Sequence, residues 1–160
     1  MKESLPKFGL ELVEDKSRIL PFERNSKTKD TFDYLGFTHL NGKTRYGQYT
    51  VGHLISKKKK MFKSNLKKWV KENRNMEFKL FMAKLTRKLI GTNNYYSLSD
   101  TMKELRRMCN HAFWVVFKWM NRRSQRKSFV LEKFQEEWIK RIRKPYIHVD
   151  IWAYVKVTYN

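Results

Sequence analysis

The feature that most constrains the fold of this chain is a change of hydrophobic period near Ser56. Before that point, short runs of β-branched and aromatic residues are separated by turn residues, as in "TFDYLGFTHL" at 31–40. After it, apolar residues recur every three or four positions, which is the spacing of one face of an α-helix. The sequence therefore predicts an α+β chain, with a short N-terminal antiparallel β-hairpin or small sheet followed by a mainly α-helical bundle of three to four helices.

Strand signals occur at 10–12, 18–20 and 31–40. Asn41 and Gly42 follow the last of these runs, and both residues tolerate the positive φ of a type I′ turn. A hairpin turn is therefore predicted at Asn41-Gly42, with a second strand that follows it directly or begins only near Tyr46.

Four helices are expected after Ser56. We expect Asn75 to cap the second helix and Gly91 to end it, so that "GTNNYYS" at 91–97 forms a connector. Thr101 and Glu104 have the spacing of a capping box, which opens or lies inside a long third helix. The apolar stripes of the first three helices comprise Phe62, Leu66, Trp69 and Val70, then Phe78, Phe81, Leu85 and Leu89, and then Met102, Leu105, Cys109, Ala112, Val116 and Trp119.

The fourth helix is expected to be shorter than the third. Ser128 can cap it, and Pro145 would stop it because proline lacks the backbone N–H of a helix. Its inward positions are Leu131, Phe134, Trp138 and Ile142.

Charge indicates the class of partner. The formal net charge is +21, and residues 57–160 contain 27 lysines and arginines against eight acidic residues, a net +19. Between 57 and 88 there are 13 basic residues and two glutamates, so like charges repel along the predicted helices without acidic partners. This pattern favours a polyanion, with nucleic acid ahead of an anionic membrane surface or a merely solvated exterior.

Other sequence features limit the remaining classes. Cys109 is the only cysteine, so neither a disulfide framework nor a zinc site of the usual spacing is expected, and a reducing compartment suits the chain. No apolar run approaches the roughly 18–20 residues that span a bilayer. We therefore expect a cytoplasmic chain with no membrane partner and no small-molecule ligand.

Exposed aromatic side chains beside basic ones favour RNA, because they can stack on unpaired bases. Tyr95 and Tyr96, in the expected connector, are candidate stacking platforms. Adjacent tyrosines at a helix start can equally supply one core residue and one rim residue.

Four blocks of sequence carry a family resemblance: "FGLELVEDKSRIL" (8–20), "TFDYLGFTHL" (31–40), "LTRKLIGTNNYY" (85–96) and "FKWMNRRSQRKSFVLEKF" (117–134). Their order and approximate spacing resemble those of group II intron reverse transcriptases, also called maturases, over about residues 8–148. The resemblance implies that residues 1–55 are the C-terminal part of a polymerase palm and that 56–145 are its helical thumb, or domain X. Residues 146–160 form a tail, and a bacterial or organellar origin would suit the family.

The resemblance also implies roles for individual residues. "YLGF", which is Tyr34, Leu35, Gly36 and Phe37, looks like the primer grip, a hairpin whose backbone and aromatic side chains hold the 3′ end of the growing strand. Lys16 matches a lysine near the phosphates of the incoming nucleotide, although it can also be only a turn lysine.

Catalysis by this chain alone is not expected. Two-metal phosphoryl transfer needs clustered carboxylates, which the family takes from a Tyr-x-Asp-Asp turn and an earlier aspartate. The five aspartates here are never adjacent, and that turn is missing. No cofactor is therefore expected in this chain, and Mg²⁺ would belong to the missing part of the palm.

The preferred function is an RNA-binding thumb that clamps a template-primer duplex and binds group II intron RNA, to assist splicing and reverse transcription. One alternative is a subunit of a split reverse transcriptase, completed by a separate chain with the palm and fingers, and another is a truncated, inactive remnant. The candidate nucleic-acid contacts are Lys57, Lys58, Lys59, Lys60, Lys63, Lys67, Lys84, Arg87, Lys88, Tyr95, Tyr96, Arg122, Arg123, Gln125 and Arg126.

Overall fold

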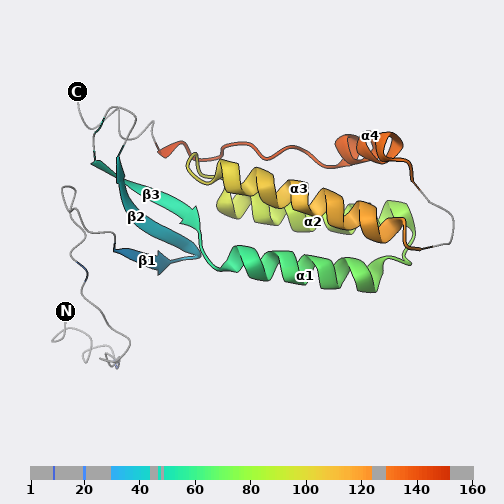
Figure 1. Cartoon of the computed structure of the whole chain (residues 1–160), viewed down its shortest axis with the longest axis horizontal. Coiled ribbons are helices and arrows are strands. Elements are labelled where there is room, and N and C mark those ends of the chain that lie inside the picture. The colour runs from blue at the N-terminus through green and yellow to red at the C-terminus, as the bar shows by residue number, and fades with distance from the viewer. Residues whose placement is uncertain are drawn as a thin grey trace.

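The structure, a computed structural model, describes residues 9, 20, 30–43, 47, 49–123 and 129–151. An antiparallel sheet in the order β1-β2-β3 comprises β1 (Thr31–Tyr34), β2 (Phe37–Lys43) and β3 (Tyr49–Ile55). It is followed by α1 (Lys58–Asn73), α2 (Phe78–Tyr96), α3 (Met102–Met120) and α4 (Leu131–Arg141). The sheet lies at one end of the helices, and α1 and α4 flank the pair α2 and α3 (Figure 1). The α+β prediction is confirmed.

The turn between β1 and β2 lies at Leu35 and Gly36. Tyr34 pairs with Phe37, so the loop has two residues, and both have positive φ values, 47° at Leu35 and 83° at Gly36. A two-residue loop with positive φ at both positions is the type I′ hairpin turn.

The predicted turn at Asn41-Gly42 is wrong. Both residues lie inside β2, where Asn41 is opposite Val51 and Gly42 is opposite Thr50. β2 pairs with β3 as far as Lys43, which is opposite Tyr49, so the chain passes from β2 to β3 only after Lys43.

The helices pack through the apolar stripes predicted for them. Leu66, Val70, Phe81, Leu85, Leu89, Ala112, Val116, Phe134 and Ile142 are buried in one core cluster, and Met102 and Leu105 are also buried. Phe62, Trp69, Phe78, Trp119 and Trp138 are partly buried against the cluster, and Met82 and Met120 join it. Leu131, the first residue of α4, is by contrast 40% exposed, so its predicted inward position is wrong.

The ends of α2 differ from the prediction. Its N-cap is Glu77 rather than Asn75, and the helix continues through Gly91 to Tyr96. Asn93 is buried, and its Oδ1 atom lies 3.7 Å from the Cys109 sulfur of α3. Packing of this last part of α2 against α3 outweighs the roughly 1 kcal/mol cost of an exposed helical glycine.

The boundaries of α3 and α4 are closer to expectation. Thr101 is the N-cap of α3, but no capping box forms, because its hydroxyl group donates to the carbonyl oxygen of Tyr96. The N-cap of α4 is Val130, and the helix ends before Pro145 as predicted. Ser128, the predicted cap, lies outside the described residues.

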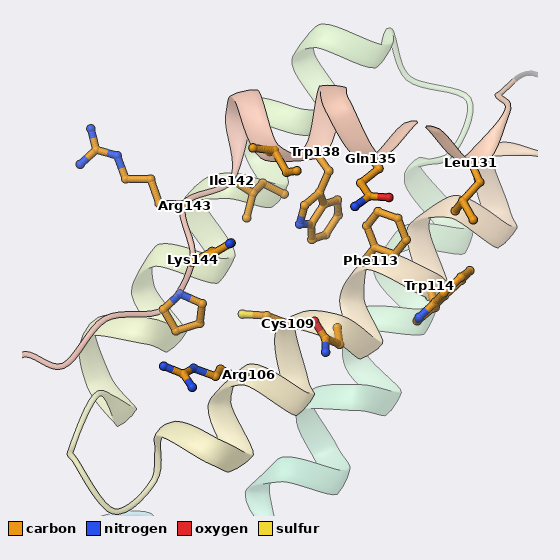
Figure 2. A pocket seen from close by; sticks show the side chains of 13 residues that line it. Arg106, Cys109, Phe113, Trp114, Leu131, Gln135, Trp138, Ile142, Arg143 and Lys144 are labelled. Carbon is orange, nitrogen blue, oxygen red and sulfur yellow. The ribbon is translucent and has the colours of Figure 1, made fainter. Parts of the chain in front are cut away.

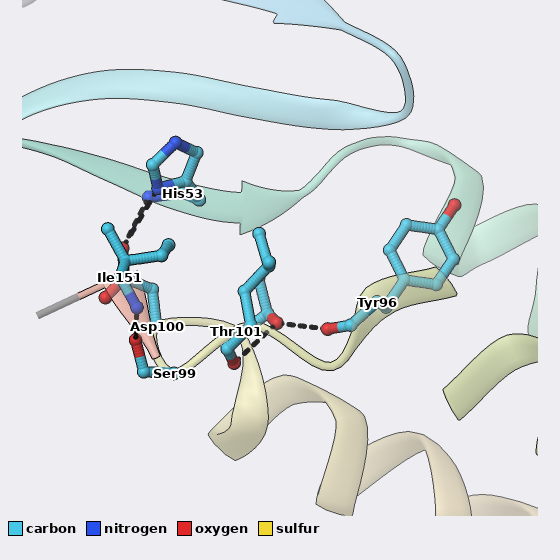
Figure 3. Close-up of polar contacts among 7 residues, drawn as sticks. His53, Tyr96, Ser99, Asp100, Thr101 and Ile151 are labelled. Carbon is cyan, nitrogen blue, oxygen red and sulfur yellow. Dashed lines mark hydrogen bonds and ion pairs between the residues drawn. The ribbon is translucent and has the colours of Figure 1, made fainter. Parts of the chain in front are cut away.

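Two acidic side chains join the sheet to α3. The Asp100 carboxylate accepts a hydrogen bond from the backbone N–H of His53 at 3.2 Å, and it contacts the His53 ring nitrogen at 3.1 Å (Figure 3). Glu104, in the first turn of α3, accepts a hydrogen bond from the backbone N–H of Ile55 at 2.7 Å. The end of β3 is therefore held by carboxylates at the start of α3.

The segment after α4 returns along α3 to this junction (Figure 1). His148 donates its backbone N–H to the carbonyl oxygen of Ser97 at 3.0 Å, and Val149 forms a parallel bridge with Leu98. Ile151 donates its N–H to the Ser99 hydroxyl at 3.2 Å (Figure 3). Residues 146–151 therefore lie along the connection between α2 and α3 and are hydrogen-bonded to it. Residues 152–160 lie outside the described residues.

Candidate nucleic-acid interface

One side of α1 carries a row of cations. Lys60, Lys63, Lys67 and Lys71 are exposed and recur at three or four residues, so they share one side of the helix, which Arg74 extends by one position past its end. We call these five residues the α1 basic face. It combines five positive charges along about four helical turns.

The α1 basic face borders α3. Burial lowers the pKa of His111 of α3, and the nearby positive charge of Lys63 on α1 lowers it further. The Arg74 guanidinium lies over the ring of Trp119, 5.4 Å from its centroid. The row of cations therefore runs along the junction between α1 and α3.

The start of α1 is also basic. Lys57 and Lys58 are exposed, Lys57 occupies the N-cap position without a side-chain cap, and the first turn contains no acidic residue. A helix N-terminus carries a partial positive charge, so cations there are unfavourable by roughly 0.3–1 kcal/mol each. Ser56 accepts the backbone N–H groups of Lys58 and Lys59, so an anion at this end of the helix would be attracted by the two lysine ammonium groups and the partial positive charge of the helix start.

Lys59 differs from its neighbours. Its ammonium group lies 2.6 Å from Glu104 Oε1, and its side chain is 41% exposed. The ion pair links α1 to α3, whereas Lys57, Lys58 and Lys60 have no acidic partner among the described residues. Of the four consecutive lysines, Lys59 is the one that the structure assigns to a structural contact.

A second group of exposed cations, the α2 basic group, lies on α2. Lys84, Arg87 and Lys88 are exposed and share one side of the helix. The Lys88 ammonium lies 5.3 Å from the centroid of Trp69, which stacks on Phe81. Trp69, a residue of α1, therefore brings α1 into contact with the α2 basic group.

The two predicted arginines at the end of α3 have different surroundings. Arg122 is exposed, and its guanidinium lies 5.3 Å from the Trp119 centroid, so that Trp119 contacts both Arg74 and Arg122. Arg123 is half-buried and donates to the carbonyl oxygen of Met76 at 3.1 Å, in the turn between α1 and α2. Arg122 is therefore available to a ligand, and Arg123 ties two helix ends together.

Tyr95 and Tyr96 lie in the last turn of α2, not in a loop. The Tyr95 hydroxyl donates to the carbonyl oxygen of Leu35, and its ring stacks on Phe37 at 5.9 Å. Tyr96 meets Phe37 edge-on at 5.4 Å, and burial raises its pKa. Both tyrosines hold the hairpin turn, although Tyr95 remains 51% exposed.

The "YLGF" turn projects from this support. Tyr34 and Leu35 are 61% and 64% exposed, whereas Gly36 is buried against the tyrosines. A Cβ atom on Gly36 would lie 3.2 Å from the Tyr96 hydroxyl oxygen, so both the positive φ and the close approach require glycine. The turn therefore presents the aromatic side chain of Tyr34 and the aliphatic side chain of Leu35 at its exposed tip.

Some predicted contacts cannot be placed. Lys16, Gln125 and Arg126 lie outside the described residues. Conversely, Lys71, Arg74 and His111 were not predicted as site residues. The spacing of Lys71 and Arg74 from Lys67 would have placed them on the same side of α1, but the proximity of His111 depends on how α1 packs against α3.

Acidic counter-charges are sparse. Within the described ranges, ion pairs of lysine or arginine with a carboxylate involve only Lys59, Lys140 and Arg141. No group of three or more His, Cys, Asp or Glu side chains in the same ranges could hold a metal ion. None of the described helices is long and apolar enough to cross a membrane.

Comparison with known proteins places this arrangement in a family. The model of the group II intron, maturase-specific domain matches residues 59–141, which is more than half of the chain and spans all four helices. Neither curated proteins nor solved structures gave a match. The chain therefore belongs to the family of the group II intron, maturase-specific domain.

Proposed function

We propose that this chain is the RNA-binding thumb, or domain X, of a group II intron maturase, and that it binds intron RNA and a template-primer duplex through α1 and α2. The observation that carries the proposal is the α1 basic face, whose five cations have no carboxylate within ion-pair distance in the described part of the chain. Such a row repels itself unless a polyanion supplies the opposite charge.

The geometry favours a nucleic-acid backbone as the polyanion. Residues at three- or four-residue spacing have their Cβ atoms roughly 5–6 Å apart, so their long cationic side chains can reach successive phosphates on one strand. The α1 basic face, the start of α1 and Arg122 together extend the charge along the whole of α1. A phosphate backbone can therefore contact several of these side chains in one register.

Salt dependence tests the proposal. Each neutralised phosphate contributes roughly 0.7–0.9 to the slope of log affinity against log salt concentration. We expect a steep negative slope for binding of the chain to group II intron RNA, measured by filter binding or fluorescence anisotropy. Replacing Lys63, Lys67 and Lys71 by Gln should reduce the slope by roughly 2–3, because each lysine would have released one counterion.

A matched control separates this surface from net charge. Lys79, Lys103 and Lys133 are also exposed, and the triple Gln variant of these residues removes the same charge from α2, α3 and α4. We expect that variant to retain most of the slope. Equal losses in the two triple variants, or a nearly flat slope in the unmodified chain, would contradict the proposal.

The hairpin tip favours a second role. Tyr34 and Leu35 are exposed at a turn whose carbonyl is fixed by Tyr95, as a primer grip requires. In a split reverse transcriptase, this chain should stimulate primer extension by a separately produced fragment with the fingers and palm. Tyr34→Ala with Leu35→Ala should abolish the stimulation while RNA binding persists, and no stimulation by the unmodified chain would refute this role.

A further inference from the structure

A groove of about 1060 Å³ lies between α3, α4 and the chain that follows α4 (Figure 2). Its α3 wall is formed by residues spaced as one side of a helix, from Arg106 to Trp114, and its α4 wall by residues from Leu131 to Ile139. None of the residues of the α1 basic face lines it, so the two surfaces are separate. Its volume is at the upper end of the roughly 300–1,000 Å³ of small-molecule sites.

The two ends of the groove differ in chemistry. Arg106, Lys144 and Arg143 are spread along one end, with the Arg143 guanidinium pointing outward, and Trp114 lies at the other end, with Trp138 between (Figure 2). No acidic side chain is among the described residues that line the groove. The lining is thus an aromatic surface with a purely cationic rim.

Trp114 is the exposed part of that aromatic surface. It is 55% exposed and meets the ring of Phe113 edge-on at 5.2 Å, so its position is set while a large part of the indole remains open. Trp138 packs against Phe113 at 5.3 Å and belongs mainly to the helix contact. The Asn110 and Gln135 amides add hydrogen-bonding groups to the same lining.

We propose that this groove binds an unpaired nucleotide of RNA, with the base stacked on Trp114 and the phosphates of the same strand at Arg106, Arg143 and Lys144. A nucleobase has a flat face for the indole and polar edges for the two amides, and its strand supplies the negative charge. A protein partner would need a segment with both acidic and aromatic or apolar side chains. In RNA, every nucleotide supplies a flat base and a negatively charged phosphate. The inference rests on the proposed function, because it assigns a second contact to the same RNA-binding chain.

Single-stranded and paired RNA distinguish this groove from the α1 basic face. The probe is a fluorescein-labelled oligouridylate, compared with a blunt RNA duplex of the same length by anisotropy. Trp114→Ala should weaken oligouridylate binding roughly tenfold, within the range measured for loss of one stacked base, and should leave duplex binding unchanged. Trp114→Phe should restore most of the affinity, because it keeps an aromatic face.

Two further variants control for fold and charge. Leu54 is similarly exposed, at 42%, but lies on β3, outside the groove and outside the proposed RNA contacts, so Leu54→Ala should change neither affinity. Arg143→Gln with Lys144→Gln should reduce the salt slope for oligouridylate by roughly 0.7 for each phosphate that these side chains neutralise. Circular dichroism of each variant checks that the helices remain.

Several outcomes would overturn the inference while leaving the proposed function intact. Unchanged oligouridylate affinity in Trp114→Ala is one, and an equal loss for the duplex is another, because a paired base cannot stack in the groove. Loss of binding to a fingers and palm fragment, with RNA affinities preserved, would make the groove a protein interface instead. Absence of salt-dependent binding to any RNA would reject the proposed function itself.

Discussion

Replacement of Glu104 should loosen the junction between the sheet and the helices. One carboxylate oxygen accepts the backbone N–H of Ile55 at 2.7 Å, and the other pairs with the Lys59 ammonium at 2.6 Å. The Glu104 side chain is only 17% exposed, and Ile55 is buried. In Glu104→Ala, the Ile55 N–H would lose its partner in a place that water reaches poorly.

The expected loss of stability is dominated by that N–H group. An unsatisfied buried donor costs about 1–3 kcal/mol. The Lys59 pair adds roughly 0.2–1 kcal/mol, because Lys59 is 41% exposed and solvent screens the pair. Together the two losses amount to about 1–4 kcal/mol, which should lower the Tm by roughly 3–15 °C in a chain of this length.

Thermal and urea unfolding, followed by circular dichroism, measure this effect. Glu104→Gln keeps an acceptor for Ile55 and should lose only about 1 kcal/mol, whereas Lys59→Gln should lose less than about 1 kcal/mol. Glu136→Ala removes an exposed glutamate of α4 and serves as the matched control. The reasoning is refuted if Glu104→Ala unfolds within about 0.5 kcal/mol of the control.

Three more perturbations test other parts of the structure. Gly36→Ala should lower the free energy of unfolding by roughly 1–3 kcal/mol. Alanine at this position would have to adopt a φ of 83°, and its Cβ atom would lie 3.2 Å from the Tyr96 hydroxyl oxygen. An unchanged midpoint of urea unfolding would contradict this prediction. Lys63→Gln should raise the pKa of His111, because the lysine charge helps to hold that pKa down, and an NMR titration that shows no rise would disprove their proximity. Burial raises the pKa of Cys109 from 9.0 to about 11, so iodoacetamide should alkylate it roughly 100-fold more slowly near neutral pH than in urea, with a rate that still increases above pH 9. Equal rates in the folded and unfolded chain would show that the thiol is not buried.

Helical periodicity in the sequence correctly predicted which side chains the helices bury. Leu66, Val70, Leu85 and Val116 are buried as their spacing predicted, because a helix that packs on one side must place its apolar residues every three or four positions. The number and order of the helices follow from the same pattern. The family resemblance added the location of the hairpin turn at "YLGF", which local propensity did not indicate.

The errors arose where a tertiary contact overrode a local preference. Leucine rarely adopts positive φ, yet Leu35 does so because the Tyr95 hydroxyl binds its carbonyl from α2. Gly91 did not end α2, because Asn93 packs against α3. A single sequence contains no direct signal for either contact.

The sequence predicted which basic residues belong to the candidate site, but not how their side chains are arranged. Consecutive lysines indicated a polyanion partner, but only the structure separates Lys59, which pairs with Glu104, from Lys60, which faces solvent. Similarly, Arg122 and Arg123 are equivalent in sequence and differ in their contacts. Partners from distant segments decide which cations remain available.

The position of Trp119 between Arg74 and Arg122 has an entropic consequence. A free arginine side chain carries about 2 kcal/mol of rotamer entropy, part of which is lost when it grips a phosphate. Contact with the indole ring already restricts both guanidinium groups before any ligand arrives. Part of the ordering cost of binding is therefore met during folding, so these two arginines can contribute more to affinity than equally charged lysines that move freely in solvent.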